Sequence, residues 1–303
     1  MTLEQIVDKA REGRERRIAV VGAADTGVLQ AVCQAEKEGI AVPVLIGKEE
    51  EIREKAKEMS IGIDEYEIID ETDLAQAAKR GVRLAAEGQV DAIMKGNLHS
   101  AILMKAILNK EWGVRSGGLL SHVGIIQCPK ISRLLFLTDG AMCMYPDLKQ
   151  KAEIVKNAVA LARRLGVNQP KVAALAAVET VNPDMPATLD AAALALMGQR
   201  GQIEGCMIDG PLALDNAVSM EAAEKKGVKS PVGVAGQADI LLVPNIEAGN
   251  VILKASRHLG DCQTVGLLMG AKVPIIMSSR ADTAQNKKLA IACAVYQGEE
   301  VEL

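Results

Sequence analysis

Short apolar runs and amphipathic segments alternate at a regular spacing through the first hundred residues. No other feature of the chain constrains the fold as strongly. The apolar runs predict strands at 17–21, 42–46, 66–69 and 90–94, and the segments between them predict helices. A repeated strand–helix order produces a parallel sheet with right-handed crossovers. The predicted fold class is therefore α/β.

The alternation resumes after a long amphipathic segment at 147–165 and includes a helix expected over 216–226. About ten strands are expected in all. That number exceeds what one open sheet holds comfortably. The texture of the sequence also changes near residues 115–125, where glycine and serine are frequent. These features predict two α/β domains with a cleft between them.

Composition excludes several classes of function. The chain has 303 residues, of which 49% are hydrophobic but only 2% aromatic, so the core must be aliphatic. Few aromatic side chains argue against a carbohydrate platform or a stacking surface for single-stranded nucleic acid. A net charge of −4 provides no basic field for a nucleic acid or a membrane. A local pocket of lysine and arginine would still suit a small anionic substrate.

The sequence also favours a cytoplasmic location. Its six cysteines are scattered singly without a CxxC pair, which is typical of reduced thiols. The N-terminus is charged and helical, unlike a signal peptide. Apolar runs stay well short of the ~20 residues that span a bilayer.

Two stretches combine a strand end with cationic and small polar residues. The strand at 90–94 leads to Lys95, Gly96, Asn97, His99 and Ser100. An expected strand at 273–277 leads to Ser278, Ser279 and Arg280, and then to a helix for which Asp282 is the expected N-cap. Such an arrangement can bind an anion. Because Lys95 directly follows apolar strand residues, its burial would require a paired anion; the alternative is an exposed lysine beside a helix cap.

A second group of donors lies in the glycine-rich connection. Arg115, Ser116 and Gly117, followed by Ser121 and His122, could bind phosphate or carboxylate. The alternatives are a solvated loop and a structural histidine. With three histidines and no HExxH spacing, the sequence predicts no metal site.

Several polar residues follow predicted strands, where parallel sheets place ligand groups. They are Asp139, Asp209, which with Gly210 and Pro211 ends a strand expected at 205–208, and Asn245. Capping or turn formation is the alternative for each. The turn at 22–27 lacks the GxGxxG spacing and is interpreted as an ordinary strand-to-helix turn.

These motifs together resemble the phosphate acetyl/butyryltransferase family, and its butyryl branch more than its acetyl branch. The resemblance runs from about residue 15 to the C-terminus. It includes Lys95-Gly96, Leu108–Glu111, Arg115 with Gly117, Ser121–Val123, Leu135–Asp139, Pro146–Leu148, Asp209–Ala213, Gly236–Asp239, Pro244–Asn250 and Ser279–Asp282.

The resemblance implies a two-domain α/β fold like that of the isocitrate/isopropylmalate dehydrogenases. The first domain would comprise 1–120 plus 270–303, and the second 121–269. The implied reaction converts a short-chain acyl-CoA, such as butyryl-CoA, and phosphate to acyl phosphate and CoA in the interdomain cleft. No metal, nicotinamide or other cofactor is implied, and the family forms dimers.

The resemblance also assigns roles to residues. Arg280 would bind the phosphoryl group and Ser279 would donate to the developing oxyanion. Asn245, Gly249 and Asn250 match a polar motif that lines the cleft. The acetyl branch has an aspartate seven residues after the serine as the proposed base, but this chain has Asn286. Asp282 and His122 are the remaining candidates for the base, and dispensing with a base is a further possibility.

Two other functions remain open at this point. One is an NAD-dependent decarboxylating dehydrogenase of the same fold, which would need an acidic metal cluster. The other is a non-catalytic protein that binds acyl-CoA or phosphate, which Asn286 alone favours.

Overall fold

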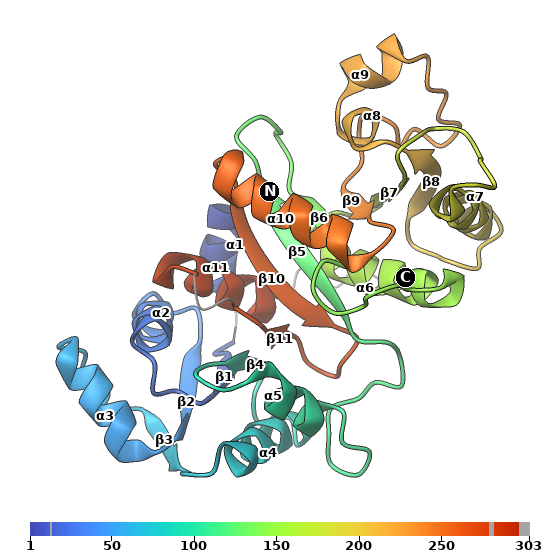
Figure 1. The fold of residues 1–303 in the computed structure, drawn as a ribbon. Helices are drawn as coiled ribbons and strands as arrows, with labels where there is room; N and C mark the ends of the chain where they lie inside the picture. Colours follow the sequence, from blue (N-terminus) through green and yellow to red (C-terminus); the bar gives the residue numbers. More distant parts are fainter. Residues whose placement is uncertain (13, 279–281, 297–303) are drawn as a thin grey trace. The chain divides into compact units, whose positions relative to one another are not determined.

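The computed structural model describes residues 1–12, 14–278 and 282–296 (Figure 1). Within this part of the chain, residues 3–118 and 265–296 form one compact unit, here called the N-terminal unit. Residues 1–2 and 119–264 form a second, here called the central unit. The domain division expected from the sequence, 1–120 plus 270–303 and 121–269, has bounds a few residues away from these and stays a prediction.

The N-terminal unit is built from a sheet and the helices that cover it. Its strands are β1 (Arg17–Val21), β2 (Val42–Gly47), β3 (Glu67–Asp70), β4 (Ala92–Lys95), most of β10 (Gln263–Met269) and β11 (Ile275–Ile276). Its helices are α1 (Leu3–Ala10), α2 (Thr26–Lys37), α3 (Glu49–Glu58), α4 (Leu74–Ala86), α5 (Ser100–Ile107) and α11 (Ala284–Val295).

The sheet of this unit has the strand order β3-β2-β1-β4-β11-β10. All neighbours are parallel except β11 and β10, which are antiparallel. Residues 18–21 of β1 and all four residues of β4 are buried, as expected for apolar strands covered on both faces. Helix α11 packs against α1 and α2, whereas α4 packs against β1, β2 and α5 (Figure 1). The predicted α/β class is confirmed.

The central unit has its own set of neighbouring strands, with helices packed against them. Its elements are β5 (Ser121–Gln127), β6 (Leu135–Thr138), α6 (Leu148–Arg164), β7 (Lys171–Leu175), α7 (Pro186–Gln199), β8 (Met207–Leu212), α8 (Leu214–Val218), α9 (Met220–Lys225), β9 (Ile240–Leu242) and α10 (Ile246–Leu259). The strand order is β5-β6-β9-β7-β8, parallel apart from the β5–β6 hairpin. Leu137, Ala173 and Leu241 are fully buried or nearly so in its aliphatic core.

Three predicted elements differ from those observed. The last strand was expected over 273–277, but β11 has only two residues, since Pro274 has no N–H to donate to the ladder. The helix expected over 216–226 is two helices, because Ser219 adopts an extended conformation and its side chain caps α9 at Ala222 N. Asp209 and Pro211 do not follow a strand, since β8 continues through both to Leu212.

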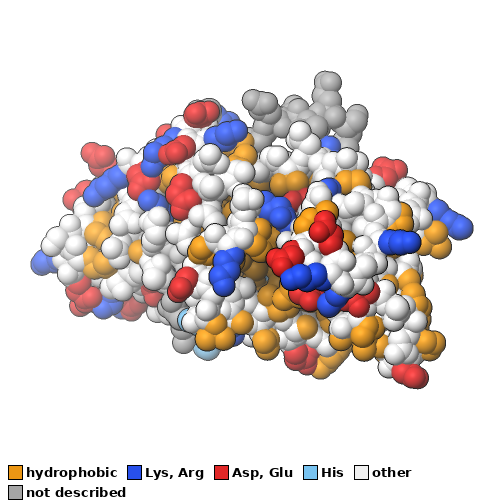
Figure 2. All heavy atoms as spheres, turned by 90° about the horizontal axis from the view of Figure 1, so that it is seen from above, with side chains coloured by type: hydrophobic (Ala, Val, Ile, Leu, Met, Phe, Trp, Pro, Cys, Tyr) orange, Lys and Arg blue, Asp and Glu red, His pale blue; other side chains and the backbone are white. Residues whose placement is uncertain are grey.

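The described surface is mixed in charge. On the face shown in Figure 2, acidic and basic side chains of the described residues are interspersed, and neither forms a broad field of one sign. Within the same part of the chain, none of the helices has the length and apolar character needed to cross a bilayer.

Candidate active site

A polar pocket lies in the N-terminal unit at the carboxyl ends of β1 and β4. The strand order 3-2-1-4 makes this the point where the connections change direction, and open α/β sheets bind ligands at such points. The pocket has a volume of about 110 Å³. It is lined by Asp25, Val28, Lys95, Gly96, Asn97, Ser278 and Lys287.

The two loops that form its floor are hydrogen-bonded to each other. Gly96 N donates to Val21 O at 2.8 Å and Asn97 N donates to Gly22 O at 2.7 Å. A Cβ on Gly96 would lie 2.2 Å from Gly22 O, which is impossible without backbone movement. Glycine at position 96 therefore lets the two loops approach each other closely.

Two ammonium groups and one carboxylate give the pocket a positive balance. Lys95 is 8% exposed and its Nζ donates to Gly96 O at 3.2 Å, so the expectation of a buried lysine is confirmed. Lys287, on α11, is 5% exposed and donates to Asp282 O. The carboxylate is that of Asp25, whose Oδ1 accepts from Val28 N at 2.8 Å and caps α2. This balance favours an anionic ligand.

Asp25 and Lys287 were missed in the sequence. The turn at 22–27 is indeed an ordinary strand-to-helix turn capped by Asp25, as interpreted, but it also lines the pocket. Lys287 lies in α11, where nearly every residue from 287 to 295 is buried. The helix therefore has no polar face in its sequence pattern that would mark Lys287 as unusual. A lysine pair inside an apolar helix was the available signal.

The other predicted residues of the first stretch, and three from the glycine-rich connection, are not among the described residues that line this pocket. His99 is the N-cap residue of α5 and Ser100 begins that helix; both are exposed. Arg115 is exposed and its backbone bridges to Ala271, while Ser116 Oγ donates to Gly270 O at 2.6 Å. Gly117 is also exposed. Their roles as ligands stay predictions.

The second stretch is only partly described. Ser278 lines the pocket, but Ser279 and Arg280, the strongest candidates from the sequence, lie outside the described residues. Asp282 is not the N-cap of α11. The cap is Thr283, whose side chain accepts from the backbone N of Asn286 at 3.2 Å.

In the central unit, His122 and Asp139 lie together at the β5–β6 hairpin. His122 is 8% exposed, and its backbone N donates to Asp139 Oδ2 at 2.8 Å. Burial lowers the pKa of His122 below its ordinary value of 6.5, although the Asp139 carboxylate acts in the opposite direction. Among the described residues, Nδ1 of His122 has no hydrogen-bond partner. A neutral imidazole with an unused nitrogen can accept a proton.

The two carboxylates predicted as ligand groups in this unit, Asp139 and Asp209, already have hydrogen-bond partners. Asp139 Oδ1 accepts from the backbone N of Ala141 and of Met142, both at 2.8 Å. Asp209 accepts from Gly210 N at 2.9 Å and from the Ser230 hydroxyl at 2.5 Å. These contacts match the turn-forming alternative for both residues.

Three residues match the polar motif at the start of α10. Asn245 caps α10 by accepting from Ala248 N at 3.0 Å, and Asn250 Nδ2 donates to Gly140 O at 3.2 Å. A Cβ on Gly249 would lie 2.7 Å from Asp139 O, so glycine lets α10 approach the hairpin. The motif therefore has a clear packing role, and its role in binding stays a prediction.

Two further predicted residues are buried. Ser121 is fully buried and its Oγ accepts from Asn157 Nδ2 at 2.8 Å. Pro211 is buried in β8.

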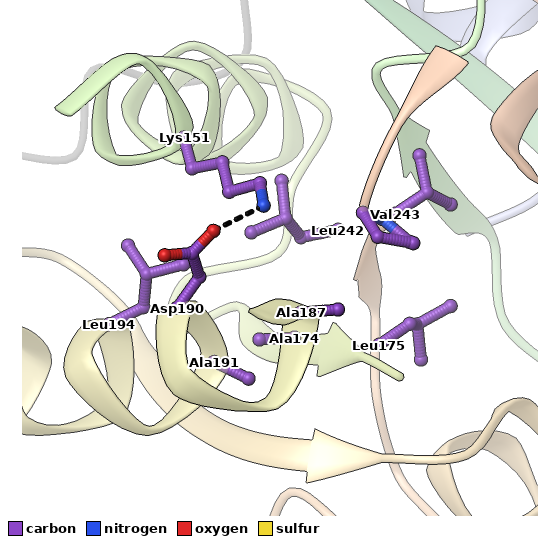
Figure 3. Close-up of a pocket in the computed structure, with 10 residues that line it drawn as sticks. Lys151, Ala174, Leu175, Ala187, Asp190, Ala191, Leu194, Leu242 and Val243 are labelled. Carbon is purple, nitrogen blue, oxygen red and sulfur yellow. Dashed lines mark hydrogen bonds and ion pairs between the residues drawn. The ribbon is translucent and has the colours of Figure 1, made fainter. Parts of the chain in front are cut away.

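A second hollow lies in the central unit near the ends of β7 and β9 (Figure 3). It contains an ion pair, at 2.6 Å, between the buried Lys151 of α6 and the partly exposed Asp190 of α7. Its volume of about 10 Å³ has space for roughly one water molecule. It is therefore too small, as it stands, for an acyl chain. Within the described residues no group of three or more His, Cys, Asp or Glu side chains is placed to bind a metal ion.

Comparison with known proteins identifies the family. Residues 1–79 and 71–295 match the family model described as phosphate acetyl/butaryl transferase. The chain belongs to this family. It is 44% identical to the phosphate butyryltransferase of Clostridium acetobutylicum over 293 residues, 97% of each chain. It is 41% identical to the phosphate acetyltransferase of Thermotoga maritima, covering 96% of this chain and 98% of the other. Membership makes the chain an acyltransferase, as expected from the sequence.

Solved structures agree with this assignment. The branched-chain phosphotransacylase from Enterococcus faecalis is 30% identical, with a TM-score of 0.82 over 93% of this chain and 99% of the other. A 4-hydroxythreonine-4-phosphate dehydrogenase from Klebsiella pneumoniae is 14% identical, with a TM-score of 0.58 over 94% of this chain and 100% of the other. At that identity the likeness concerns the fold alone. The comparisons do not favour a dehydrogenase or a non-catalytic protein.

Proposed function

We propose that the chain converts a short-chain acyl-CoA and inorganic phosphate reversibly to acyl phosphate and CoA. The observation that supports this most directly is the lysine-lined pocket at the carboxyl ends of β1 and β4, in a chain of this family. A pocket with a positive balance suits a phosphate dianion. Ser278, which lines the pocket, directly precedes the proposed reacting residues Ser279 and Arg280 in the sequence, and this supports the proposal.

The proposed transfer is direct. A phosphate oxygen attacks the thioester carbonyl carbon, the C–O bond forms, and the C–S bond breaks with departure of the CoA thiolate. The phosphate proton goes to that thiolate. Lys95 and Arg280 hold the phosphate within reach of the carbonyl, and Ser279 donates to the oxyanion of the tetrahedral intermediate.

A base matters chiefly in the reverse direction, where the CoA thiol must be ionised before it attacks acyl phosphate. His122 is the better candidate, because its lowered pKa keeps it neutral and able to accept a proton at neutral pH. Asp282 is the second candidate. A thiol with a pKa near 8.5 also ionises without much help, so the proposal does not depend on either residue.

The proposal extends to the substrate range and the assembly. Relatives named for butyryl, acetyl and branched-chain substrates together suggest a straight or branched acyl group of two to five carbons. We further propose that no cofactor is required, that the chain acts in the cytoplasm, and that it assembles as a homodimer or a larger homo-oligomer.

The test follows thiol release from butyryl-CoA with and without inorganic phosphate. Phosphate-dependent release is expected from the wild type. Arg280→Ala should lower turnover by about 100-fold or more, because a charge that stabilises the transition state is lost, while the melting temperature stays unchanged. Absence of phosphate-dependent release with every C2 to C5 acyl-CoA would refute the function, and wild-type rates for Arg280→Ala would refute the role of Arg280.

A further inference from the structure

Lys287 is a buried lysine that has no carboxylate partner among the described residues. Three helical lysines of the described residues are nearly inaccessible: Lys151, Lys287 and Lys288, at 6%, 5% and 8% exposure. Lys151 pairs with Asp190 and Lys288 pairs with Glu38, each at 2.6 Å. Lys287 forms no ion pair with a described residue, and its ammonium donates to the backbone carbonyl of Asp282. A buried ammonium costs free energy unless an anion compensates it.

The Lys287 ammonium belongs to the pocket at the carboxyl ends of β1 and β4. The side chain lines that pocket together with Lys95, Ser278 and Asp25. A Cβ built on Gly27 would lie 3.5 Å from both Lys287 Nζ and Asp25 Oδ1, so the ammonium and the carboxylate are within about 7 Å of each other. The described side chains that line the pocket therefore carry two positive charges and one negative charge.

The size of the pocket limits what the anion can be. Its volume of about 110 Å³ is far below the ~300 Å³ at which pockets begin to enclose larger ligands. An inorganic oxyanion of five heavy atoms fits this space, whereas the nucleotide part of CoA does not. Lysine binds such an ion as a mobile point charge with three donors.

We propose that Lys287 is a phosphate-binding residue that, with Lys95, holds inorganic phosphate in the N-terminal unit. This inference rests on the proposed acyl transfer to phosphate and adds the residue that selects the phosphate substrate. Helix α11 follows Ser279 and Arg280 in the chain and carries Lys287 one turn after its Thr283 cap.

The experiment compares Lys287→Gln with Lys288→Gln. The two residues are neighbours on one helix with similar burial, but only Lys287 lines the pocket. Lys287→Gln should raise the KM for phosphate about 10- to 100-fold, the effect of losing a charge-assisted hydrogen bond, and change the KM for butyryl-CoA less than about twofold. Lys288→Gln should leave both KM values unchanged and lower the melting temperature, because Glu38 loses its ion pair with Lys288 and keeps only the one with Arg11.

A second readout is independent of turnover. Inorganic phosphate alone should raise the melting temperature of the wild type and of Lys288→Gln, because it binds the folded state. Lys287→Gln should lose most of that rise. A phosphate KM within twofold of the wild type together with a preserved rise would overturn the proposal.

Two further outcomes of these experiments also test the role of Lys287. If Lys287→Gln does not fold, Lys287→Arg keeps the charge on a larger, planar group and should raise the phosphate KM at least about threefold; an unchanged value would overturn the proposal. If the wild type releases no thiol from any acyl-CoA, the proposed function fails. The phosphate-dependent melting rise, and its loss in Lys287→Gln, would then still decide whether Lys287 binds the anion.

Discussion

At the scale of single residues, the chemistry of this chain depends on a few buried polar groups whose partners differ. Lys288 and Lys287 are adjacent in sequence and nearly equal in burial. Lys288 pairs with the Glu38 carboxylate, whereas Lys287 donates to a backbone carbonyl and lines the pocket. His122 is buried, its Nδ1 has no partner within the part of the chain that the structure describes, and the neighbouring Asp139 carboxylate already accepts from backbone N–H groups. Burial alone therefore does not distinguish a structural polar residue from a functional one; the partner does.

His122 should make stability depend on pH on the acid side. Its pKa in the folded chain is below 6.5, so below pH 6.5 the unfolded chain binds a proton that the folded chain does not. The free energy of unfolding should therefore fall as pH decreases through this window, with a slope of up to about 1.4 kcal/mol per pH unit, until the folded pKa is reached. Urea unfolding at a series of pH values measures the slope.

His122→Gln should flatten that part of the pH profile. The matched control is His258→Gln, because His258 is exposed at the end of α10. The role assigned to burial is wrong if His122→Gln and the wild type lose stability equally between about pH 6.5 and pH 5.

At the scale of elements, the pocket depends on how closely two strand-to-helix loops pack. The loops after β1 and β4 share two backbone hydrogen bonds, and Gly22 has φ of +70°. A φ in this region favours glycine, so the turn after β1 is set locally. The turn after β4 is different, because Gly96 is required by contact with a loop more than seventy residues away in sequence.

Gly96→Ala should destabilise the protein by at least about 2 kcal/mol, because the new Cβ would lie 2.2 Å from Gly22 O and the backbone must move. It should also impair phosphate binding, since the same loops line the pocket. Gly62→Ala is the control: Gly62 lies in an exposed loop with no atom within 4 Å of the added Cβ, and its effect should stay within about 0.5 kcal/mol. Equal denaturation midpoints for the two variants would contradict the packing argument.

At the scale of the whole molecule, stability comes from two aliphatic cores, each enclosed in its own α/β unit. The central unit also contains an ion pair between Lys151 of α6 and Asp190 of α7 (Figure 3). The Lys151 side chain is 7% exposed and that of Asp190 is 30% exposed. Such a pair contributes little net stability compared with apolar packing, but removing one partner leaves a buried charge.

Asp190→Asn should lower the free energy of unfolding by about 2–4 kcal/mol, because Lys151 would remain buried without a counter-charge. The comparison is Glu153→Gln, which removes the exposed pair with Lys156 on the same helix α6 and should cost at most about 1 kcal/mol. Chemical denaturation of both variants measures the difference. A loss for Asp190→Asn no larger than for Glu153→Gln would show that the pair is effectively solvated.

The sequence predicted local and repetitive features well. The alternation of apolar runs and amphipathic segments specifies strands and helices locally. Their alternating order favours a parallel sheet, because each helix forms a right-handed crossover between two strands. Errors arose where one residue changes the backbone or removes a donor, as Ser219 does between α8 and α9 and Pro274 does in β11.

For the site, the sequence alone determined its family and the strand ends near which polar groups gather, because both depend on residues close together in the chain. Only the tertiary structure decided which of those groups face a common pocket. In the structure, Asp25, Lys95 and Lys287 line one pocket. Asp139, Asp209 and Asn245 instead hydrogen-bond to nearby backbone N–H groups. The N-cap of α11 is Thr283 and not Asp282. The physical reason is that burial and pairing are set by contacts between segments far apart in sequence, and no periodicity along the chain reports them.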